Sequence, residues 1–126
     1  MLKIEILKYD FTVCKLKEIT EKPKKENFCF LSRTDDEISL VCPTHLVPEN
    51  TEAREDSWRG FRICGTLDFS LIGILANIAS LLAEEKISIF AVSTYNTDYV
   101  FTKKDVFDNA INVLKTSGYI IHDTEI

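Results

Sequence analysis

The hydrophobic period of the chain changes once, and this change constrains the fold more than any other feature of the sequence. Over residues 3–16 and 28–42, apolar and polar residues alternate, which is typical of half-buried strands. After residue 70, apolar residues recur at the three- and four-residue spacing of an amphipathic helix. The helical stripe consists of Leu71, Ile74, Leu75, Ile78 and Leu82. The two periods together predict a mixed α+β structure.

The elements predicted between residues 58 and 122 follow the order strand, helix, strand, strand, helix, strand. The first strand is predicted from the alternation over residues 58–67 and is expected to end near Gly65. It is followed by a helix at 71–83, strands at 87–93 and 99–101, a helix that begins after Thr102, and a strand at 119–121. The second helix presents Val106, Phe107, Ala110, Ile111 and Leu114 on one face. This order predicts a ferredoxin-like βαββαβ fold, an antiparallel sheet with both helices on one face.

The ends of both helices carry sequence signals. Asp68 and Ser70 are the candidate N-caps of the first helix, because their side-chain oxygens accept bonds from its first amides. Thr102 and Asp105 have the spacing of a capping box at the start of the second helix. Gly118 stands where a C-terminal glycine is expected.

The N-terminal half is predicted to be mostly β. The segment 34–37 (Thr-Asp-Asp-Glu) separates two apolar runs and predicts a hairpin turn rather than a catalytic acid pair. The charged segment 17–26 is expected to be a solvated loop. The Pro-containing, acidic segment 43–57 predicts one short helical turn and an exposed loop. This loop is the predicted boundary between a β-rich half at residues 1–57 and a βαββαβ domain at residues 58–126.

Composition excludes several classes of protein. The 126 residues include 15 Lys and Arg against 20 Asp and Glu, a net charge of −5, which argues against nucleic acid as a partner. No stretch approaches the roughly 20 apolar residues of a membrane span, and the first residues do not resemble a signal peptide. The four cysteines lack a C-x-x-C pair. We therefore expect reduced thiols in a cytoplasmic protein that contacts no membrane.

The sequence contains no enzyme motif. The glycine-rich nucleotide signatures and the G-x-S-x-G elbow are all missing. Cys42 and His45 lie three residues apart, which leaves a small Cys-His enzyme as a minor alternative. Residues at zinc-site spacings are missing too. The expected protein is therefore not an enzyme and uses neither a metal nor another cofactor.

Two segments are candidate binding elements. The first is at residues 68–74, where free amides at a helix N-terminus favour a carboxylate or phosphate. Gly73 would let a ligand approach the backbone closely. The alternative is that Gly73 only makes room for a packed neighbour. In the second, at residues 93–98 (Ser-Thr-Tyr-Asn-Thr-Asp), polar groups converge and Asp98 would face a cation. Here the alternative is a hairpin turn whose side chains satisfy the local backbone.

These two segments also carry a resemblance. Residues 65–102, from Gly-Thr-Leu-Asp-Phe-Ser-Leu-Ile-Gly through Ser-Thr-Tyr-Asn-Thr-Asp-Tyr-Val, resemble an ACT domain, a small βαββαβ regulatory module that binds amino acids, often between two copies. They are similar to stand-alone bacterial ACT proteins related to the aspartate kinase regulatory region, and to modules of the animal TOR-pathway arginine sensors. The upstream segment 32–43 and Trp58-Arg59 resemble the degenerate, ACT-like first half of those proteins.

The resemblance implies a ligand site. It places the α-carboxylate and α-amine of an amino acid at the backbone of the first helix's start, and the polar turn on the other side. Asp98 is then the acid that faces an amine or guanidinium. The implied ligand-binding residues are Leu71, Ile72, Gly73, Ile74, Thr94, Tyr95 and Asp98. The arginine-sensor modules carry acids shortly before the helix glycine, where this chain has Ser70, Leu71 and Ile72, which argues against arginine and leaves room for a smaller or less basic amino acid.

The resulting hypothesis is a non-enzymatic regulatory module that senses a free amino acid at an ACT–ACT interface. We expect a homodimer, because the sheet face without helices needs a cover, which the N-terminal half, a second chain or both would supply. No catalytic domain is joined to the predicted one, so any output passes to a regulated enzyme partner on another chain. The alternative is a structural or oligomerisation protein that kept the fold without the ligand.

Overall fold

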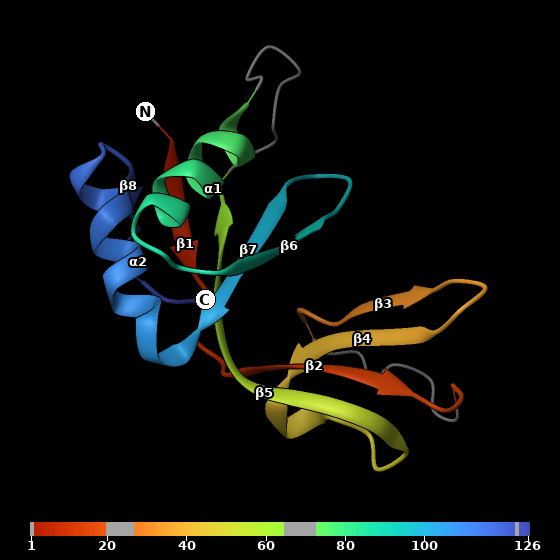
Figure 1. The fold of residues 1–126 in the computed structure, drawn as a ribbon. Coiled ribbons are helices and arrows are strands. Elements are labelled where there is room, and N and C mark those ends of the chain that lie inside the picture. The colour runs from red at the N-terminus through yellow and green to blue at the C-terminus, as the bar shows by residue number, and fades with distance from the viewer. Residues whose placement is uncertain (1, 20–26, 65–72, 123) are drawn as a thin grey trace. The chain divides into compact units, whose positions relative to one another are not determined.

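The computed structural model describes residues 2–19, 27–64, 73–122 and 124–126 (Figure 1). In chain order the elements are β1 (Lys3–Ile6), β2 (Phe11–Leu16), β3 (Phe30–Arg33), β4 (Ile38–Pro43), the short 3₁₀ helix η1 (Thr44–Leu46), β5 (Thr51–Ile63), α1 (Ile74–Glu84), β6 (Ile89–Ser93), β7 (Asp98–Lys103), α2 (Lys104–Thr116) and β8 (Ile120–Ile121). From β5 onward the order is the predicted strand, helix, strand, strand, helix, strand. The α+β prediction is therefore confirmed.

The chain forms two compact units. One, which we call the helical unit, comprises Met1–Lys8 and Arg59–Ile126; the other, the strand unit, comprises Tyr9–Trp58. Strand β5 belongs to both, since its first eight residues lie in the strand unit and its last five in the helical unit. The first strand of the chain, β1, belongs to the helical unit. The division into a degenerate β-rich half at residues 1–57 and a βαββαβ domain at residues 58–126 stays a prediction.

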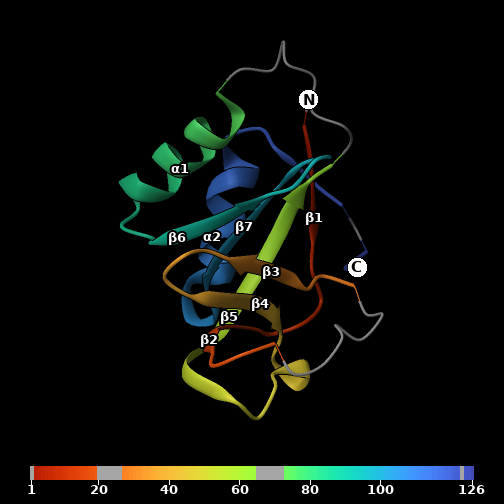
Figure 2. The ribbon, with the colours of Figure 1, turned by 90° about the vertical axis from the view of Figure 1, so that its right-hand side faces the viewer.

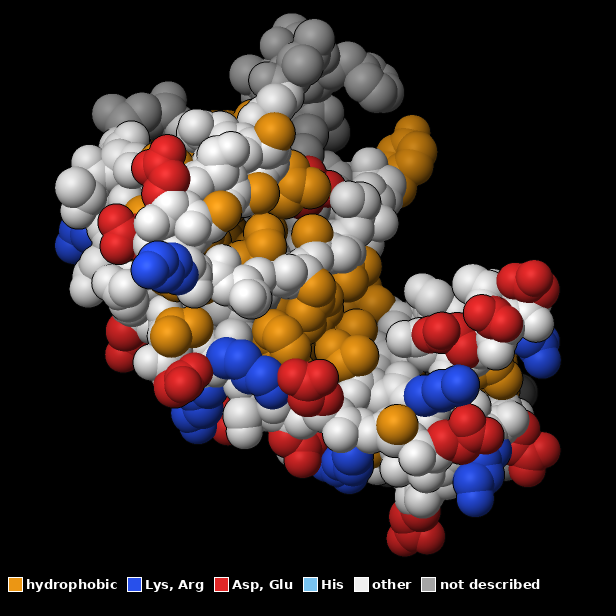
Figure 3. All heavy atoms as spheres, in the orientation of Figure 1, with side chains coloured by type: hydrophobic (Ala, Val, Ile, Leu, Met, Phe, Trp, Pro, Cys, Tyr) orange, Lys and Arg blue, Asp and Glu red, His pale blue; other side chains and the backbone are white. Residues whose placement is uncertain are grey.

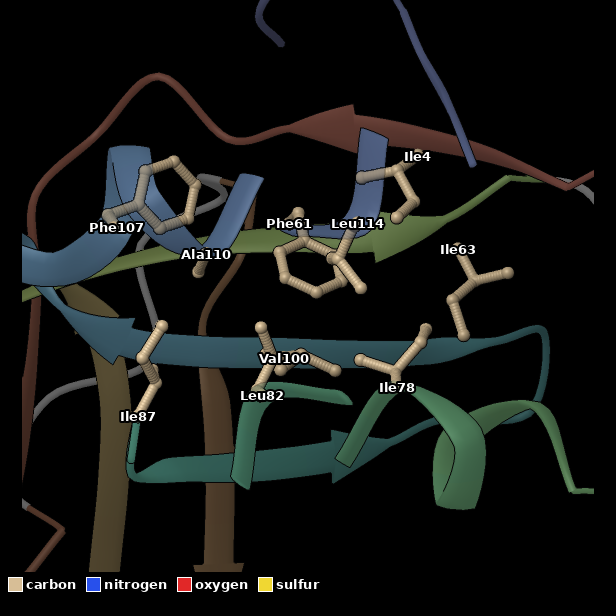
Figure 4. Close-up of a cluster of buried hydrophobic side chains, with 10 residues drawn as sticks. All are labelled: Ile4, Phe61, Ile63, Ile78, Leu82, Ile87, Val100, Phe107, Ala110 and Leu114. Atoms are coloured by element: carbon tan, nitrogen blue, oxygen red, sulfur yellow. The ribbon is translucent and has the colours of Figure 1, made fainter. Parts of the chain in front are cut away.

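The helical unit has the strand order β6-β7-β5-β1-β8 (Figures 1 and 2). Strand β1 runs antiparallel to β5, with Ile4 opposite Ile63, and parallel to β8, with Lys3 opposite Ile120. The predicted antiparallel sheet therefore has one parallel pair, which the N-terminal strand creates. Figure 4 shows that α1 and α2 both face the same side of this sheet.

The core of the helical unit fills the space between the helices and the sheet (Figure 4). Its buried members are Ile4, Phe61, Ile63, Ile78, Leu82, Ile87, Val100, Phe107, Ala110 and Leu114. The helical stripes predicted from the sequence supply half of this cluster. Burial of each large apolar side chain contributes roughly 1.5–3 kcal/mol, so this layer dominates the stability of the unit.

The helix starts differ from the predicted ones. The N-cap of α1 is Gly73, in the left-handed region at φ 84°, and the predicted caps Asp68 and Ser70 lie outside the described residues. The predicted capping box at the start of α2 is wrong: the N-cap is Lys103, and Thr102 is a fully buried residue of β7 whose hydroxyl donates to the Lys103 carbonyl. Pairing with β6 and β5 extends β7 past the residue where the capping signal places the helix start.

The helix ends agree better with the sequence. Gly118 follows the C-cap of α2 at φ 101°, as predicted. The Tyr119 amide donates to the Leu114 carbonyl and the Gly118 amide to Lys115, both at 3.1 Å, which is the Schellman pattern. Helix α1 ends in the same way, with Lys86 at φ 60° in the glycine position.

The strand unit contains the predicted hairpin. Strands β3 and β4 are antiparallel, with Phe30 opposite Val41, and the Thr34 amide donates to the Glu37 carbonyl across the turn. Strand β4 pairs on its other side with β2. The helical turn predicted after Pro43 is confirmed by η1.

The loop predicted up to residue 57 is wrong over its second half. Strand β5 begins at Thr51 and pairs with β2, although residues 52–57 are all exposed. Main-chain pairing with β2 holds this segment extended although it has no apolar face. Its charged side chains therefore give no alternating pattern from which a strand could be predicted.

Candidate functional site

The first turns of helix α1 lie at the end of the sheet where β5 ends. The Asn77 side-chain amide donates to the Tyr119 hydroxyl at 2.7 Å. The next residue after Tyr119, Ile120, donates its amide to Leu2, while Cys64 donates its amide to Lys3. This chain of contacts links the start of α1 to the terminal residues of β5 through β8 and β1.

The polar turn between β6 and β7 lies at the same end. The Thr97 hydroxyl is buried and donates to the Ile63 carbonyl, the last residue of β5, at 2.7 Å. Gly73 and Ile74, the described part of the first predicted binding segment, and the polar turn therefore lie at the same end of the helical unit. In the sequence the two segments, 68–74 and 93–98, are separated by residues 75–92, and no local motif links them.

Asp98 stands on the face of the sheet that carries the helices. Residues opposite each other in an antiparallel pair share a face, and the face alternates along a strand. Asp98 pairs with Ser93, and Val100, two residues further on, is a core residue under α1 (Figure 4). The Ser93 hydroxyl donates to the half-buried Asp98 carboxylate at 2.6 Å. A carboxylate held in this way lies on the same face and at the same end as the start of α1.

The start of α1 offers backbone donors. The first bond within the helix runs from the Asn77 amide to the Gly73 carbonyl, so the amides of Ile74, Leu75 and Ala76 precede the helical pattern. No described side chain caps them. A Cβ atom built on Gly73 meets no described atom within 4 Å, so its left-handed φ, rather than a packed neighbour, is the visible reason for glycine.

The remaining predicted residues are placed less favourably. The Thr94 hydroxyl and amide both donate to the Thr97 carbonyl, which is the local turn bonding named as the alternative. Tyr95 is fully exposed. Leu71 and Ile72 lie outside the described residues. The structure thus brings Gly73, Ile74 and Asp98 to one end and face, and gives Thr94 a structural role in the turn.

A second polar cluster was missed by the sequence analysis. The Arg62 guanidinium of β5 donates from Nε to the Glu5 carboxylate of β1 at 3.1 Å and from Nη1 to the Tyr99 hydroxyl of β7 at 3.4 Å. The Cys64 thiol, at the end of β5, lies close enough to Glu5 to lower the pKa of its carboxyl. These residues lie on the sheet face opposite the helices. The cluster combines side chains from three strands that are distant in the sequence. The alternating pattern of each strand predicts a polar face but not which residues meet on it.

The Cys64 thiol and the Arg62 guanidinium lower the pKa of Glu5, because both stabilise its charged form. A carboxylate with a depressed pKa stabilises the fold above its unfolded pKa, near 4.5, and loses that contribution as the pH falls through its folded pKa. We therefore expect Glu5→Gln to lower the free energy of unfolding at neutral pH and much less at about pH 3. Urea unfolding at both pH values measures this, with exposed Glu84→Gln as the control for charge removal. A penalty that is equal at both pH values would contradict it.

The Cys42–His45 alternative lacks support. Burial raises the pKa of the Cys42 thiol to about 12, so little nucleophilic thiolate forms near neutral pH. The His45 ring packs near the Tyr9 ring, with 5.5 Å between the two ring centroids. Within the described ranges, no group of three His, Cys, Asp or Glu side chains is arranged to hold a metal ion. None of the described helices has the length and apolar character needed to cross a membrane.

Comparison with proteins of known sequence gives matches of two kinds, a family model and individual relatives. The family model described as ACT domain matches residues 53–116. The mouse cytosolic arginine sensor for mTORC1 subunit 1 is 35% identical over 82 residues, which are 64% of this chain and 24% of the sensor. The human protein of the same name is 38% identical over 66 residues. The chain spans about a quarter of the length of these relatives.

Solved structures show the same fold. A crystal structure of an Agobacterium tumefaciens protein superposes with a TM-score of 0.83 at 24% identity and covers 99% of this chain and 96% of its own. The aspartate kinase of Clostridium acetobutylicum superposes with a TM-score of 0.62 at 14% identity and covers 90% of this chain and 33% of its own. Because the family model covers half of the sequence and these structures share its fold, the chain belongs to the ACT domain family.

Proposed function

We propose that this chain is a non-enzymatic regulatory module that senses a free amino acid. The observation that supports the proposal is the shared position of the α1 start and Asp98, at one end and on one face of the helical unit. A free α-amino acid carries its carboxylate and its ammonium group on the same α-carbon, so its site needs hydrogen-bond donors and an anionic acceptor side by side. The relatives include proteins named as arginine sensors, which agrees with an amino acid as the ligand.

The two groups would play complementary roles. The amides of Ile74 and Leu75 would donate to the α-carboxylate, where the partial positive charge of the helix N-terminus adds to the attraction. The Asp98 carboxylate would accept from the α-ammonium group, and Ser93 would hold it in place. The backbone of Leu71, Ile72 and Gly73 and the turn residues Thr94 and Tyr95 complete the proposed site.

We further propose a homodimer with the ligand at an ACT–ACT interface. Among the described strands, β6 pairs only with β7, so its other edge is available for pairing with a second copy. Figure 3 shows hydrophobic side chains gathered over β6 and β7, which a partner would cover. Residues 1–57 would act as a degenerate ACT-like half. Ligand binding would order the interface and transmit a signal to a regulated enzyme partner in the cytoplasm.

One observation favours a second candidate function. Asp98 already accepts from Ser93, and Thr94 already donates to Thr97, so the turn satisfies part of its own polar groups. A structural or oligomerisation protein without a ligand would have the same bonds.

A melting-temperature screen against the twenty amino acids separates the two. A ligand at a hundredfold excess over its Kd stabilises the folded state by about 2.7 kcal/mol, which raises the melting temperature. Asp98→Ala should abolish the shift, because the ammonium group loses its counter-charge. Asp108→Ala removes an exposed carboxylate from α2 and is the matched control.

The outcomes are distinct. A shift with one amino acid that Asp98→Ala removes and Asp108→Ala retains supports sensing at this site. If the melting-temperature shift is retained in Asp98→Ala, the amino acid binds at a different site. No shift with any amino acid at millimolar concentration leaves the structural role as the better account.

A further inference from the structure

Three of the four cysteines lie on one face of the strand unit. In the β2–β4 pair Thr12 is opposite Cys42, so both side chains share a face, and Cys14 lies two residues along β2 on that same face. In the β3–β4 pair Phe30 is opposite Val41, which brings the preceding residue, Cys29, beside Cys42. Cys14 and Cys42 are buried and Cys29 is half-buried; all three are reduced.

The hairpin register decides which pair can be joined. Opposite residues in an antiparallel pair alternate between hydrogen-bonded positions and closer, non-hydrogen-bonded ones. The amide of Thr34 donates to Glu37, so this pair is hydrogen-bonded. The pairs alternate from Thr34–Glu37 back along the hairpin, so Phe30 and Val41 are hydrogen-bonded as well. The next pair, Cys29 and Cys42, then occupies a non-hydrogen-bonded position.

Such a position matches the geometry of a disulfide. The two Cα atoms are separated by about 4.5 Å at a non-hydrogen-bonded pair, within the roughly 4.4–6.8 Å that a disulfide spans. Cys14 is opposite Leu40 and is therefore only diagonal to Cys42, at about 7–8 Å. Register alone thus favours Cys29 over Cys14 as the partner of Cys42.

We propose that Cys29 and Cys42 are a redox modification site, which a disulfide oxidant converts into a cross-strand disulfide that ties the start of β3 to the end of β4. The Cys29 thiolate attacks oxidised glutathione, forms a mixed disulfide and releases one glutathione thiolate. The Cys42 sulfur then attacks the Cys29 sulfur and releases the second glutathione. The balance is two cysteine thiols and one oxidised glutathione giving one protein disulfide and two reduced glutathiones.

The surroundings assign the two roles. Burial, together with the neighbouring Cys14 and Cys29 thiols, raises the pKa of Cys42 to about 12, so Cys42 is a poor first nucleophile. Cys29 is the more accessible sulfur and reacts first. The second step is slow because it needs the Cys42 thiolate, so the disulfide should accumulate faster as the pH rises.

The test treats the whole native chain with oxidised glutathione at about pH 8, quenches with acid and labels the remaining thiols with N-ethylmaleimide in denaturant. Intact mass should show two labels instead of four, and peptide mapping should find a Cys29–Cys42 link. Cys29→Ser should abolish the link, whereas Cys64→Ser, in the helical unit, and Cys14→Ser should retain it. In the wild-type chain oxidation should also raise the melting temperature, a shift that Cys29→Ser should lose.

Several results would overturn the proposal. They are four labelled cysteines after oxidation, a link from Cys42 to Cys14, or a stable glutathione adduct on Cys29 that never resolves. A disulfide to Cys42 that still forms in Cys29→Ser would also contradict the proposal. Because Cys29 lies outside the buried core, its serine variant is expected to fold, and circular dichroism checks this.

Discussion

Phe61→Ala should lower the free energy of unfolding by about 3–5 kcal/mol, a large part of the roughly 5–15 kcal/mol that ordinary domains have. Phe61 is fully buried in β5, and Figure 4 shows its ring among core residues from both helices. Truncation removes the ring contacts and leaves a cavity that two packed helices and a sheet cannot close. The loss therefore includes a cavity cost in addition to the transfer free energy.

Urea unfolding followed by circular dichroism measures this loss. Phe61→Leu keeps most of the volume and should cost much less. Tyr95→Ala removes an aromatic ring that is fully exposed, so its unfolding midpoint should stay within experimental error of the wild type. If Phe61→Ala and Tyr95→Ala had similar effects, the core assignment would be wrong.

Gly60→Ala is the second large effect, with an expected cost of about 1–3 kcal/mol from overpacking. A Cβ atom at Gly60 would lie 2.6 Å from Cδ1 and Cε1 of the Phe101 ring and 3.2 Å from the Val100 carbonyl oxygen. The Phe101 ring cannot move aside easily, because it is fully buried and stacks on Phe90 with 4.8 Å between ring centroids. Glycine is needed at position 60 because the Phe101 ring leaves no room for a side chain, not because the backbone there needs extra freedom.

A double-mutant cycle identifies the cause of the Gly60→Ala loss. Phe101→Leu replaces the rigid ring, with its Cε1 atom, by a smaller and more flexible side chain, so the second substitution, Gly60→Ala, should cost less in that background than in the wild type. Equal costs in both backgrounds would mean that the destabilisation comes from the strand backbone and not from the ring.

The fold was predictable where side-chain pattern and burial coincide. Ile78 and Leu82 on α1, and Phe107, Ala110 and Leu114 on α2, follow the helical period and all lie in the core. The prediction failed where pairing partners override local signals. Residues 51–57 form a strand because β2 pairs with them, and Thr102 stays in β7 because the sheet continues beyond the capping signal.

The candidate site was predictable only in part. The sequence marks Gly73 and Asp98 individually, through a helix start and a polar turn, and the resemblance to the family joins them. Their common face depends on the pairing of Asp98 with Ser93, which the period of the strand does not reveal. The Glu5–Arg62–Tyr99 cluster needed three strands from distant parts of the chain, so no local pattern could disclose it.

The position of β1 has a consequence for the order of synthesis. This strand is synthesised before the other strands of the helical unit, yet it lies between β5 and β8 and pairs with residues as late as Ile121. The sheet of the helical unit therefore stays incomplete until β8 has been synthesised, and β1 forms one of its pairs only with a strand far along the chain. A fragment that starts at residue 58 would lack the neighbour on which β8 depends, whereas a circular permutant that joins the two ends would turn this latest contact into an early one.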